Sequence, residues 1–173
     1  MRKFLRIWGA VCALAVVVTI TGTTSVGGAT PASFTLTAGD LSISAPVAGV
    51  SLGTQVASTN AGTISGSLGI VTVTDQRGGA TTWTASVIAT AFTPTAGPAD
   101  PASNVSYAAG LISVTPTVVA TAVAASDLTG VSTVVTGAST GISAASWNPT
   151  ISVFVPANFA PGVYTATITH SVA

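Results

Sequence analysis

Charged side chains are scarce in this sequence. Only 5% of its 173 residues are Asp, Glu, Lys or Arg, against about 25% in an ordinary soluble domain. Four basic and four acidic residues balance, which excludes both the basic surface of a nucleic-acid-binding protein and the charge excess of a disordered chain. Cysteine and histidine occur once each, so neither a disulfide framework nor the usual zinc site is available.

The first 29 residues contain three of the four basic residues and the single cysteine, Cys12. A basic start precedes an apolar run over residues 7–20 and then small residues up to Ala29, the order found in a secretory signal peptide. We expect residues 1–29 to be removed on export, with cleavage after Ala32 as the alternative. Lipid attachment at Cys12 is disfavoured because the apolar run continues past it, and about 14 apolar residues are too few for a membrane anchor.

Residues 30–173 would then form the mature protein, with Arg77 as its only basic residue and four aspartates as its only acidic residues. A chain of this size buries enough surface for a stable core without disulfides. No second long apolar run or basic tail follows. We therefore expect no membrane anchor after signal cleavage, and any attachment to the cell surface to be non-covalent.

Short runs rich in Val, Ile and Thr alternate with Gly, Pro, Ser and Asn along the mature chain, a pattern typical of β-strands separated by turns. The predicted strands are Leu41 to Ser44, Gly69 to Thr74, Thr82 to Thr93, Leu111 to Thr115, Val131 to Thr136, Thr150 to Val155 and Val163 to Val172. Seven strands at this spacing predict an all-β fold, an antiparallel β-sandwich of the immunoglobulin-like kind.

Three segments give less definite patterns. Residues 30–40 read as a leader or a first edge strand, which leaves residues 41–173 as one domain. Residues 117–125 are too uniformly small and apolar to distinguish a strand from a short helix. Residues 93–104 contain three prolines and are predicted to form a long loop, because proline donates no ladder hydrogen bond.

The sequence contains few titratable residues of the types that carry out catalysis or bind cofactors. The only histidine, His170, lies near the end of the sequence, so no serine has an evident base beside it. The four aspartates are at least 25 residues apart, three of them in turn-like contexts, and they form neither a carboxylate pair nor a calcium loop. We expect no enzyme activity, no cofactor and no metal site.

Asp75 and Arg77 lie in a predicted hairpin turn that ends in Gly78 and Gly79. Two positions apart, their side chains are expected to pair across the turn. A surface ion pair of this kind contributes less than about 1 kcal/mol. The pair is therefore interpreted as a minor structural feature.

Four aromatic or histidine side chains are candidate ligand contacts, and each also has a structural interpretation. Trp83 and Trp147 share strand faces with apolar residues and would serve either as core anchors or as sugar contacts. Tyr164 could be a corner tyrosine whose hydroxyl bonds to backbone. His170 alternates in phase with Tyr164, which favours a partly buried packing residue over a ligand contact.

The order of these motifs resembles the WxL domain of Gram-positive cell-wall surface proteins. The proximal match is the Asp-x-Arg-Gly turn followed by Trp83-x-Ala85, and the distal match is Tyr164, Ile168, Thr169, His170 and Val172. That family carries Trp-x-Leu at the first place and Tyr-x-x-x-(Leu/Ile/Val)-Thr-Trp-x-Leu at the second. This chain departs by having Ala85 for the first leucine and His170 for the distal tryptophan.

The resemblance covers almost all of the mature chain and implies a secreted β-sandwich held non-covalently on peptidoglycan or another wall polymer. Where the family's tryptophans bind ligand, His170 puts that binding in doubt here. The alternative is a structural or adhesive surface subunit that meets other proteins through strand edges and Ser/Thr faces. We therefore expect peptidoglycan or another cell-wall polymer as the partner, other surface proteins in the alternative, and no nucleic acid.

Overall fold

The computed structural model describes Gly28 and residues 30–173. The predicted signal peptide, residues 1–29, falls outside the described residues apart from Gly28. The chain divides into two units, of which the second covers residues 36–173. The second unit contains all of the secondary structure described below.

Residues 41–173 form thirteen strands and one short 3-10 helix within the described chain. Their bounds are β1 Leu41–Ser44, β2 Gly62–Ser67, β3 Val71–Asp75, β4 Thr81–Ala89, β5 Thr93–Pro94, η1 Ala102–Asn104, β6 Val105–Ala108, β7 Ile112–Val114, β8 Val118–Ala122, β9 Ser132–Ser139, β10 Ser143–Trp147, β11 Thr150–Val155, β12 Tyr164–Thr165 and β13 Ile168–Val172. All of the strand pairs are antiparallel.

One layer consists of two sheets placed end to end. The sheet β1-β3-β10-β7 continues into β2-β11-β6, so that β2 leads into β3, β10 into β11 and β6 into β7. The joint lies at residues 68–70 and at Pro149, where the backbone N–H of Leu68 donates to the Pro149 carbonyl at 3.0 Å. Proline lacks the N–H of a ladder residue, so the long strand is interrupted there without losing a buried hydrogen bond.

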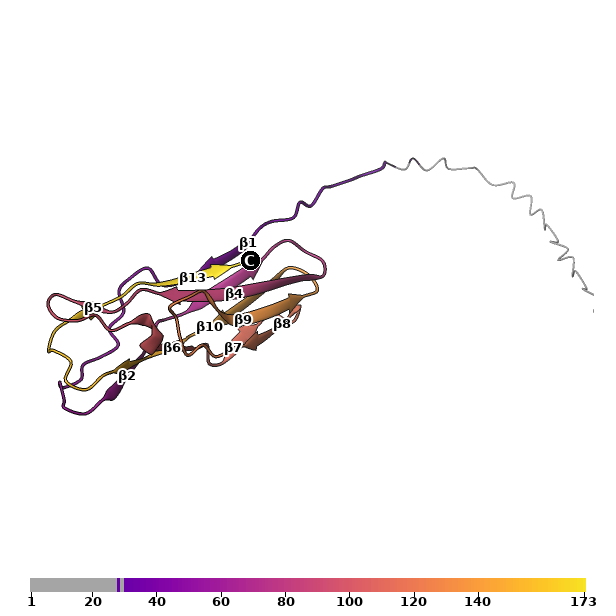
Figure 1. The fold of residues 1–173 in the computed structure, drawn as a ribbon. Coiled ribbons are helices and arrows are strands. Elements are labelled where there is room, and N and C mark those ends of the chain that lie inside the picture. The colour runs from indigo at the N-terminus through magenta and orange to yellow at the C-terminus, as the bar shows by residue number, and fades with distance from the viewer. Residues whose placement is uncertain (1–27, 29) are drawn as a thin grey trace, which may run out of the picture. The chain divides into compact units, whose positions relative to one another are not determined.

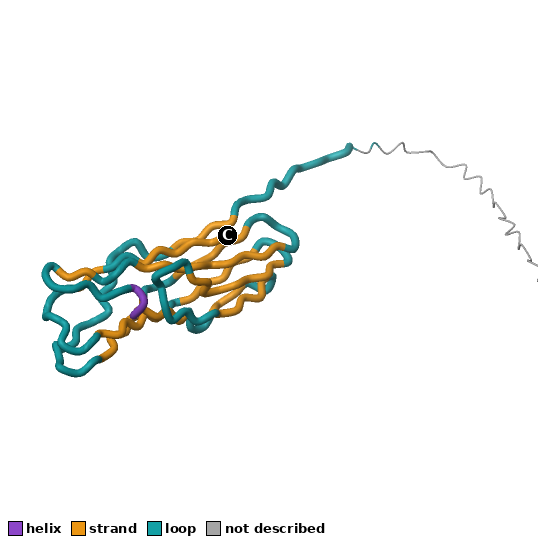
Figure 2. The backbone as a smooth tube through the Cα atoms, viewed as in Figure 1, coloured by secondary structure: helices purple, strands orange, loops and turns teal. Residues whose placement is uncertain are grey.

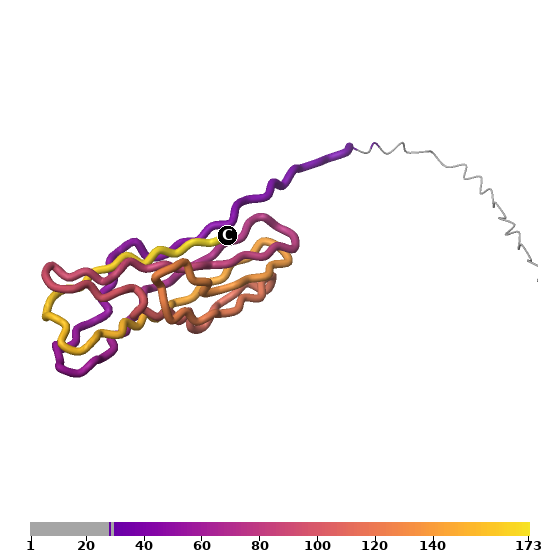
Figure 3. Tube along the Cα trace, viewed as in Figure 1, coloured from indigo at the N-terminus to yellow at the C-terminus, as the bar shows by residue number. Residues whose placement is uncertain are grey.

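The other layer is the sheet β13-β4-β9-β8, extended at one end by the pair β12-β5. Figures 1 and 2 show the two layers of strands, with the longest loops gathered around β2 and β5. Figure 3 shows the yellow C-terminal segment running beside the indigo segment that contains β1, and β1 contacts β13. The antiparallel β-sandwich predicted from the sequence is confirmed.

The core fills the space between the layers because apolar residues occupy alternate positions of each strand. In β4 the inward positions are Trp83, Ala85, Val87 and Ala89, all buried. Facing them are buried residues of the other layer, among them Val71, Val73, Tyr107, Ala145, Trp147, Ile151 and Val153. The predicted inward parity of Trp83 is thereby confirmed.

Several predicted boundaries were wrong. β2, β6 and β10 were missed, and the undecided segment 117–125 contains the strand β8. The long predicted strand from Thr82 to Thr93 ends at Ala89, and only Thr93 and Pro94 pair again, as β5. The predicted loop 93–104 keeps its irregular course, although it includes β5 and the short helix η1.

Candidate functional site

The two tryptophans predicted as ligand contacts lie in the core. Trp83 and Trp147 are each 2% exposed. Trp83 pairs with Gly137 of β9, and its indole occupies the space that a Gly137 side chain would fill. The structural interpretation as core anchors is borne out by this burial. Because neither indole presents a face to solvent, stacking of a sugar on these rings is not available in this conformation.

Trp147, Tyr107 and His170 form a chain of hydrogen bonds through the core. Trp147 Nε1 donates to the Tyr107 hydroxyl at 2.8 Å, and that hydroxyl lies 3.2 Å from His170 Nε2. The Tyr107 and His170 rings meet edge to face, with centroids 5.7 Å apart. Since the tyrosine oxygen accepts from the indole, its hydrogen is free to point to His170 Nε2, which then must be the unprotonated nitrogen.

Burial shifts the pKa values of two side chains in this chain of hydrogen bonds. It raises the pKa of Tyr107 to about 12, against the smaller opposing effect of the Trp147 hydrogen bond, and it lowers the pKa of half-buried His170. Both side chains are therefore neutral at pH 7. Tyr107 in β6 and Trp147 in β10 belong to one layer, and His170 in β13 belongs to the other. Their chain of hydrogen bonds therefore joins the two layers. Sequence reasoning missed Tyr107, although Val105 and Tyr107 alternate as core residues do.

The predicted pairing of Asp75 with Arg77 is confirmed, but the prediction that the pair lies at the surface was wrong for Asp75. Asp75 is fully buried, at 0% exposure, and its carboxylate accepts hydrogen bonds from the Arg77 N–H (3.1 Å), Nε (2.9 Å) and Nη2 (3.0 Å) and from the Thr81 hydroxyl (2.7 Å). The Arg77 side chain in particular holds the pKa of Asp75 at about 2, against the opposing effect of burial. Asp75 points inward because it occupies an inward position of β3. It anchors the hairpin and leaves no oxygen for a ligand.

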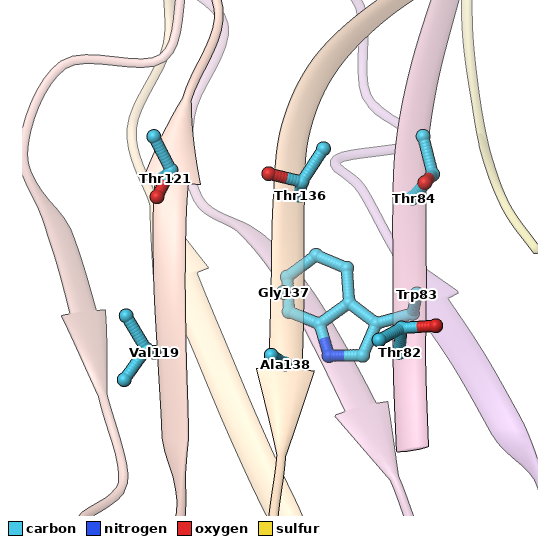
Figure 4. Close-up of a pocket in the computed structure, with 8 residues that line it drawn as sticks. All are labelled: Thr82, Trp83, Thr84, Val119, Thr121, Thr136, Gly137 and Ala138. Atoms are coloured by element: carbon cyan, nitrogen blue, oxygen red, sulfur yellow. The ribbon is translucent and has the colours of Figure 1, made fainter.

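A shallow hollow of about 330 Å³ lies where β8, β9 and β4 run side by side. We call its surroundings the threonine face: Thr82, Thr84, Val119, Thr121, Thr136 and Ala138, with Trp83 and Gly137 between them. Strand register sets two rows, Thr84 with Thr136 and Thr121, and Thr82 with Ala138 and Val119. Figure 4 shows these rows on either side of the Trp83 indole, which crosses β9 at Gly137.

The hydroxyls of the threonine face are available to a ligand. No hydrogen bond within residues 30–173 engages the hydroxyls of Thr82, Thr84 or Thr136, whereas Ser65 and Ser152 of the other layer bond to each other at 2.7 Å. None of the side chains of the threonine face carries a charge. The face therefore offers hydroxyl donors and acceptors together with methyl groups, and no ionic contact.

A larger cavity, the end cavity, lies where the long loops gather. Its volume is about 760 Å³, within the usual range of ligand sites. It is lined by the segment 49–58, by Phe92 and Asp100, and by residues 153–166, mostly with apolar side chains. Leu52 of the first segment packs against Gly66 of β2, where a Cβ would meet the Leu52 backbone. The backbone N–H of Asn158 donates to the Ser58 carbonyl at 2.9 Å, which joins the two loops.

Tyr164 is the predicted site residue that lies in the end cavity. Its hydroxyl donates to the Ala160 carbonyl at 3.0 Å, as predicted for a corner tyrosine, and its ring lies 5.8 Å from that of Phe159. Asp100 is the one charged residue of this cavity, 3% exposed, and it accepts a hydrogen bond from Asn104 Nδ2 at 2.6 Å. Burial raises the pKa of Asp100.

The four predicted contact residues thus lie in three different places, and only Trp147 and His170 are brought together, through Tyr107. Trp83 lies under the threonine face, Tyr164 in the end cavity, and Trp147 and His170 in the hydrogen-bond chain. The described part of the chain brings together no three His, Cys, Asp or Glu side chains that could hold a metal. It also has no helix with the length and apolar character of a membrane span.

Comparison with protein-family models, with characterised proteins and with solved structures gives no match.

Proposed function

We propose that this chain is an exported, non-enzymatic domain that binds the Gram-positive cell wall non-covalently, by contact between the threonine face and the uncharged glycan of peptidoglycan. Its resemblance to WxL domains supports a wall ligand. The observation that carries the proposal is the array of unengaged hydroxyls on β8, β9 and β4. A binding surface without charge must recognise its ligand through such hydroxyls and through methyl contacts.

The spacing of the array suits an extended polymer. Neighbouring strands lie about 4.8 Å apart, and alternate residues of one strand about 6.8 Å apart. Thr121, Thr136 and Thr84 therefore form a row across three strands, and Thr82 adds a hydroxyl on the next row. A glycan lying along the row would meet several hydroxyls in succession, while the hollow over Gly137 gives room for one sugar substituent.

In residues 30–173 the histidine and the buried carboxylates are engaged in structural contacts, which supports binding without catalysis. His170 is the only histidine in the sequence, and the Tyr107 hydroxyl lies at its Nε2. Among the buried carboxylates, Asp75 accepts from Arg77 and Thr81, and Asp100 accepts from Asn104. These groups are engaged in structural contacts.

The test is co-sedimentation of the chain from Thr30 onward with purified peptidoglycan sacculi. That chain holds the whole core, because every core residue lies after residue 40. The variant Thr84→Val/Thr136→Val removes two hydroxyls of the threonine face while keeping side-chain shape. Its matched control is Thr72→Val/Thr74→Val, at two outward positions of β3 in the other layer.

We expect saturable pelleting of the unmodified chain and of the control. The threonine-face variant should bind at least tenfold more weakly. Each polar group of the ligand that bonded to a removed hydroxyl would be buried without a hydrogen-bond partner. Circular dichroism and thermal unfolding would establish that both variants remain folded. Equal binding of the two variants would reject the threonine face as the contact surface, and no pelleting of the unmodified chain would reject the wall ligand.

A further inference from the structure

Two apolar features of the chain have no partner within the described residues. One is the segment 30–38, the arm, in which Phe34 is 91% exposed and Leu36 is 84% exposed. These two side chains alternate with Ser33, Thr35 and Thr37, as the inward residues of a strand alternate with outward ones. The other feature is the end cavity with its apolar lining.

We propose that the end cavity of one copy receives the arm of a second copy, with Phe34 and Leu36 as the inserted side chains. Successive copies would then associate head to tail. This interaction uses the arm and the end cavity alone, so it is independent of wall binding at the threonine face. It gives the molecule a role as a structural surface subunit in addition to the proposed wall-binding function.

The arm is too short to place its apolar pair in the cavity of its own molecule. The backbone N–H of Gly39 is fixed to the Gln76 carbonyl at 2.8 Å, beside the hairpin from which β4 starts. Phe34 is five residues away and therefore extends at most about 18 Å from that point. β4 alone covers nine residues, about 30 Å, before the chain arrives at Phe92 of the end cavity.

The chemistry of the two features is complementary. The arm contains no charged residue, and the cavity is lined chiefly by aliphatic and aromatic side chains, among them Phe92, Phe159 and Tyr164. Its single carboxylate, Asp100, is 3% exposed and bonded to Asn104, so an entering apolar chain meets no free charge. Extended segments that add to another sheet bind in this way, with alternate side chains in pockets and the backbone along an edge.

The positions of the two features determine what kind of assembly results. Gly39 and Gln76 lie at the end of the sandwich where β4 begins. The residues that line the end cavity adjoin the opposite end of β4, where Figure 1 places β2 and β5. A contact between different surfaces at opposite ends does not close on itself unless the copies form a ring. Association should therefore continue to chains of several copies as concentration rises.

The experiment is sedimentation velocity of the chain from Thr30 onward over a wide range of concentration. One variant, Phe34→Ser/Leu36→Ser, disables the arm. A second, Val163→Asp, adds a charge at a cavity-lining position that is 75% exposed, where folding is not at risk. The control is Leu111→Ser, which removes an equally exposed apolar side chain, 96% exposed, outside both features.

We expect the unmodified chain and the Leu111→Ser control to form a concentration-dependent series of oligomers, while each disabled variant stays monomeric. An equimolar mixture of the two variants should give dimers and nothing larger, because one intact arm meets one intact cavity. A monomeric unmodified chain, or arm and cavity variants that associate like the control, would overturn the proposal. A mixture that remains monomeric would also overturn it, since it would show that the arm and the cavity do not bind each other.

Discussion

At the scale of single residues, His170 is the side chain whose charge changes near neutral pH. Its Nε2 must stay unprotonated to accept from the Tyr107 hydroxyl, whose oxygen already accepts from Trp147. Protonation of Nε2 would remove the acceptor that faces the Tyr107 hydroxyl inside the sandwich. His170 therefore places a pH-sensitive group at the end of a partly buried chain of hydrogen bonds.

We predict that the free energy of unfolding falls as the pH drops below about 6.5. Burial lowers the pKa of His170 in the folded state, so in this range the unfolded chain binds more protons and is favoured by acid. Urea unfolding between about pH 7 and pH 5.5 should show this slope, and His170→Gln, which keeps an acceptor for Tyr107, should abolish it. A similar slope in the unmodified and His170→Gln proteins would mean that a group other than His170 causes the pH dependence. Asp100 acts in the opposite direction, because its pKa is raised and its protonation favours the folded state.

At the scale of elements, the alternation of apolar and polar residues predicted a strand well where large apolar residues occupy every second position. β1 and β11 were predicted at their observed bounds, because Leu or Ile in β1 and Ile or Val in β11 recur at alternate positions, although Phe154 adds an outward apolar residue in β11. β2 was missed because glycine and serine occupy four of its six positions, and β10 because alanine and serine occupy four of its five. Their place in the sheets follows from pairing with β11 and β3, which a single sequence does not display.

The candidate site was less predictable than the fold for the same reason. Strand parity placed Trp83 and His170 correctly on inward faces, but the threonine face depends on which strands are neighbours. Thr121 lies in a segment whose structure the sequence left open, and its row with Thr136 exists only through the β8–β9 register. The burial of Asp75 likewise depends on β1 and β10, which flank β3 within its sheet.

One contact between elements, that of Trp83 with Gly137, gives a direct test of the packing under the threonine face. Gly137→Ala would place its Cβ within the Trp83 indole ring, and β4 and β9 would have to separate. We predict a loss of about 3 kcal/mol of folding stability, at the upper end for overpacking, because the displaced group is a rigid buried ring. The measurement is chemical unfolding.

Gly130→Ala is the matched control, since a Cβ there meets no atom within 4 Å. It should leave stability unchanged or raise it slightly. Adding Trp83→Phe to Gly137→Ala should recover part of the lost stability, because a smaller ring leaves room for the new methyl group. Equal stability of the Gly137→Ala and Gly130→Ala proteins would mean that the indole does not lie against Gly137 in solution.

At the scale of the whole molecule, the exposed charged side chains lie away from the two proposed binding surfaces. Arg77, the one basic residue of the expected mature chain, is committed to buried Asp75. Asp100 is covered, which leaves Asp40 and Asp127 as the exposed carboxylates. Neither lines the threonine face or the end cavity. Both proposed interactions therefore depend on hydroxyl and apolar contacts, which salt does not screen.

This distribution predicts that binding to sacculi is insensitive to salt. Between about 0.05 and 0.5 M salt, exposed ionic interactions weaken strongly because the screening length falls severalfold, yet the apparent affinity of this chain should change by less than about twofold. The measurement is co-sedimentation at several salt concentrations, with polylysine on the same sacculi as the salt-sensitive control. A loss of tenfold or more with added salt would show that charged groups carry the contact. The threonine face would then not be the binding surface, because it contains no charged group.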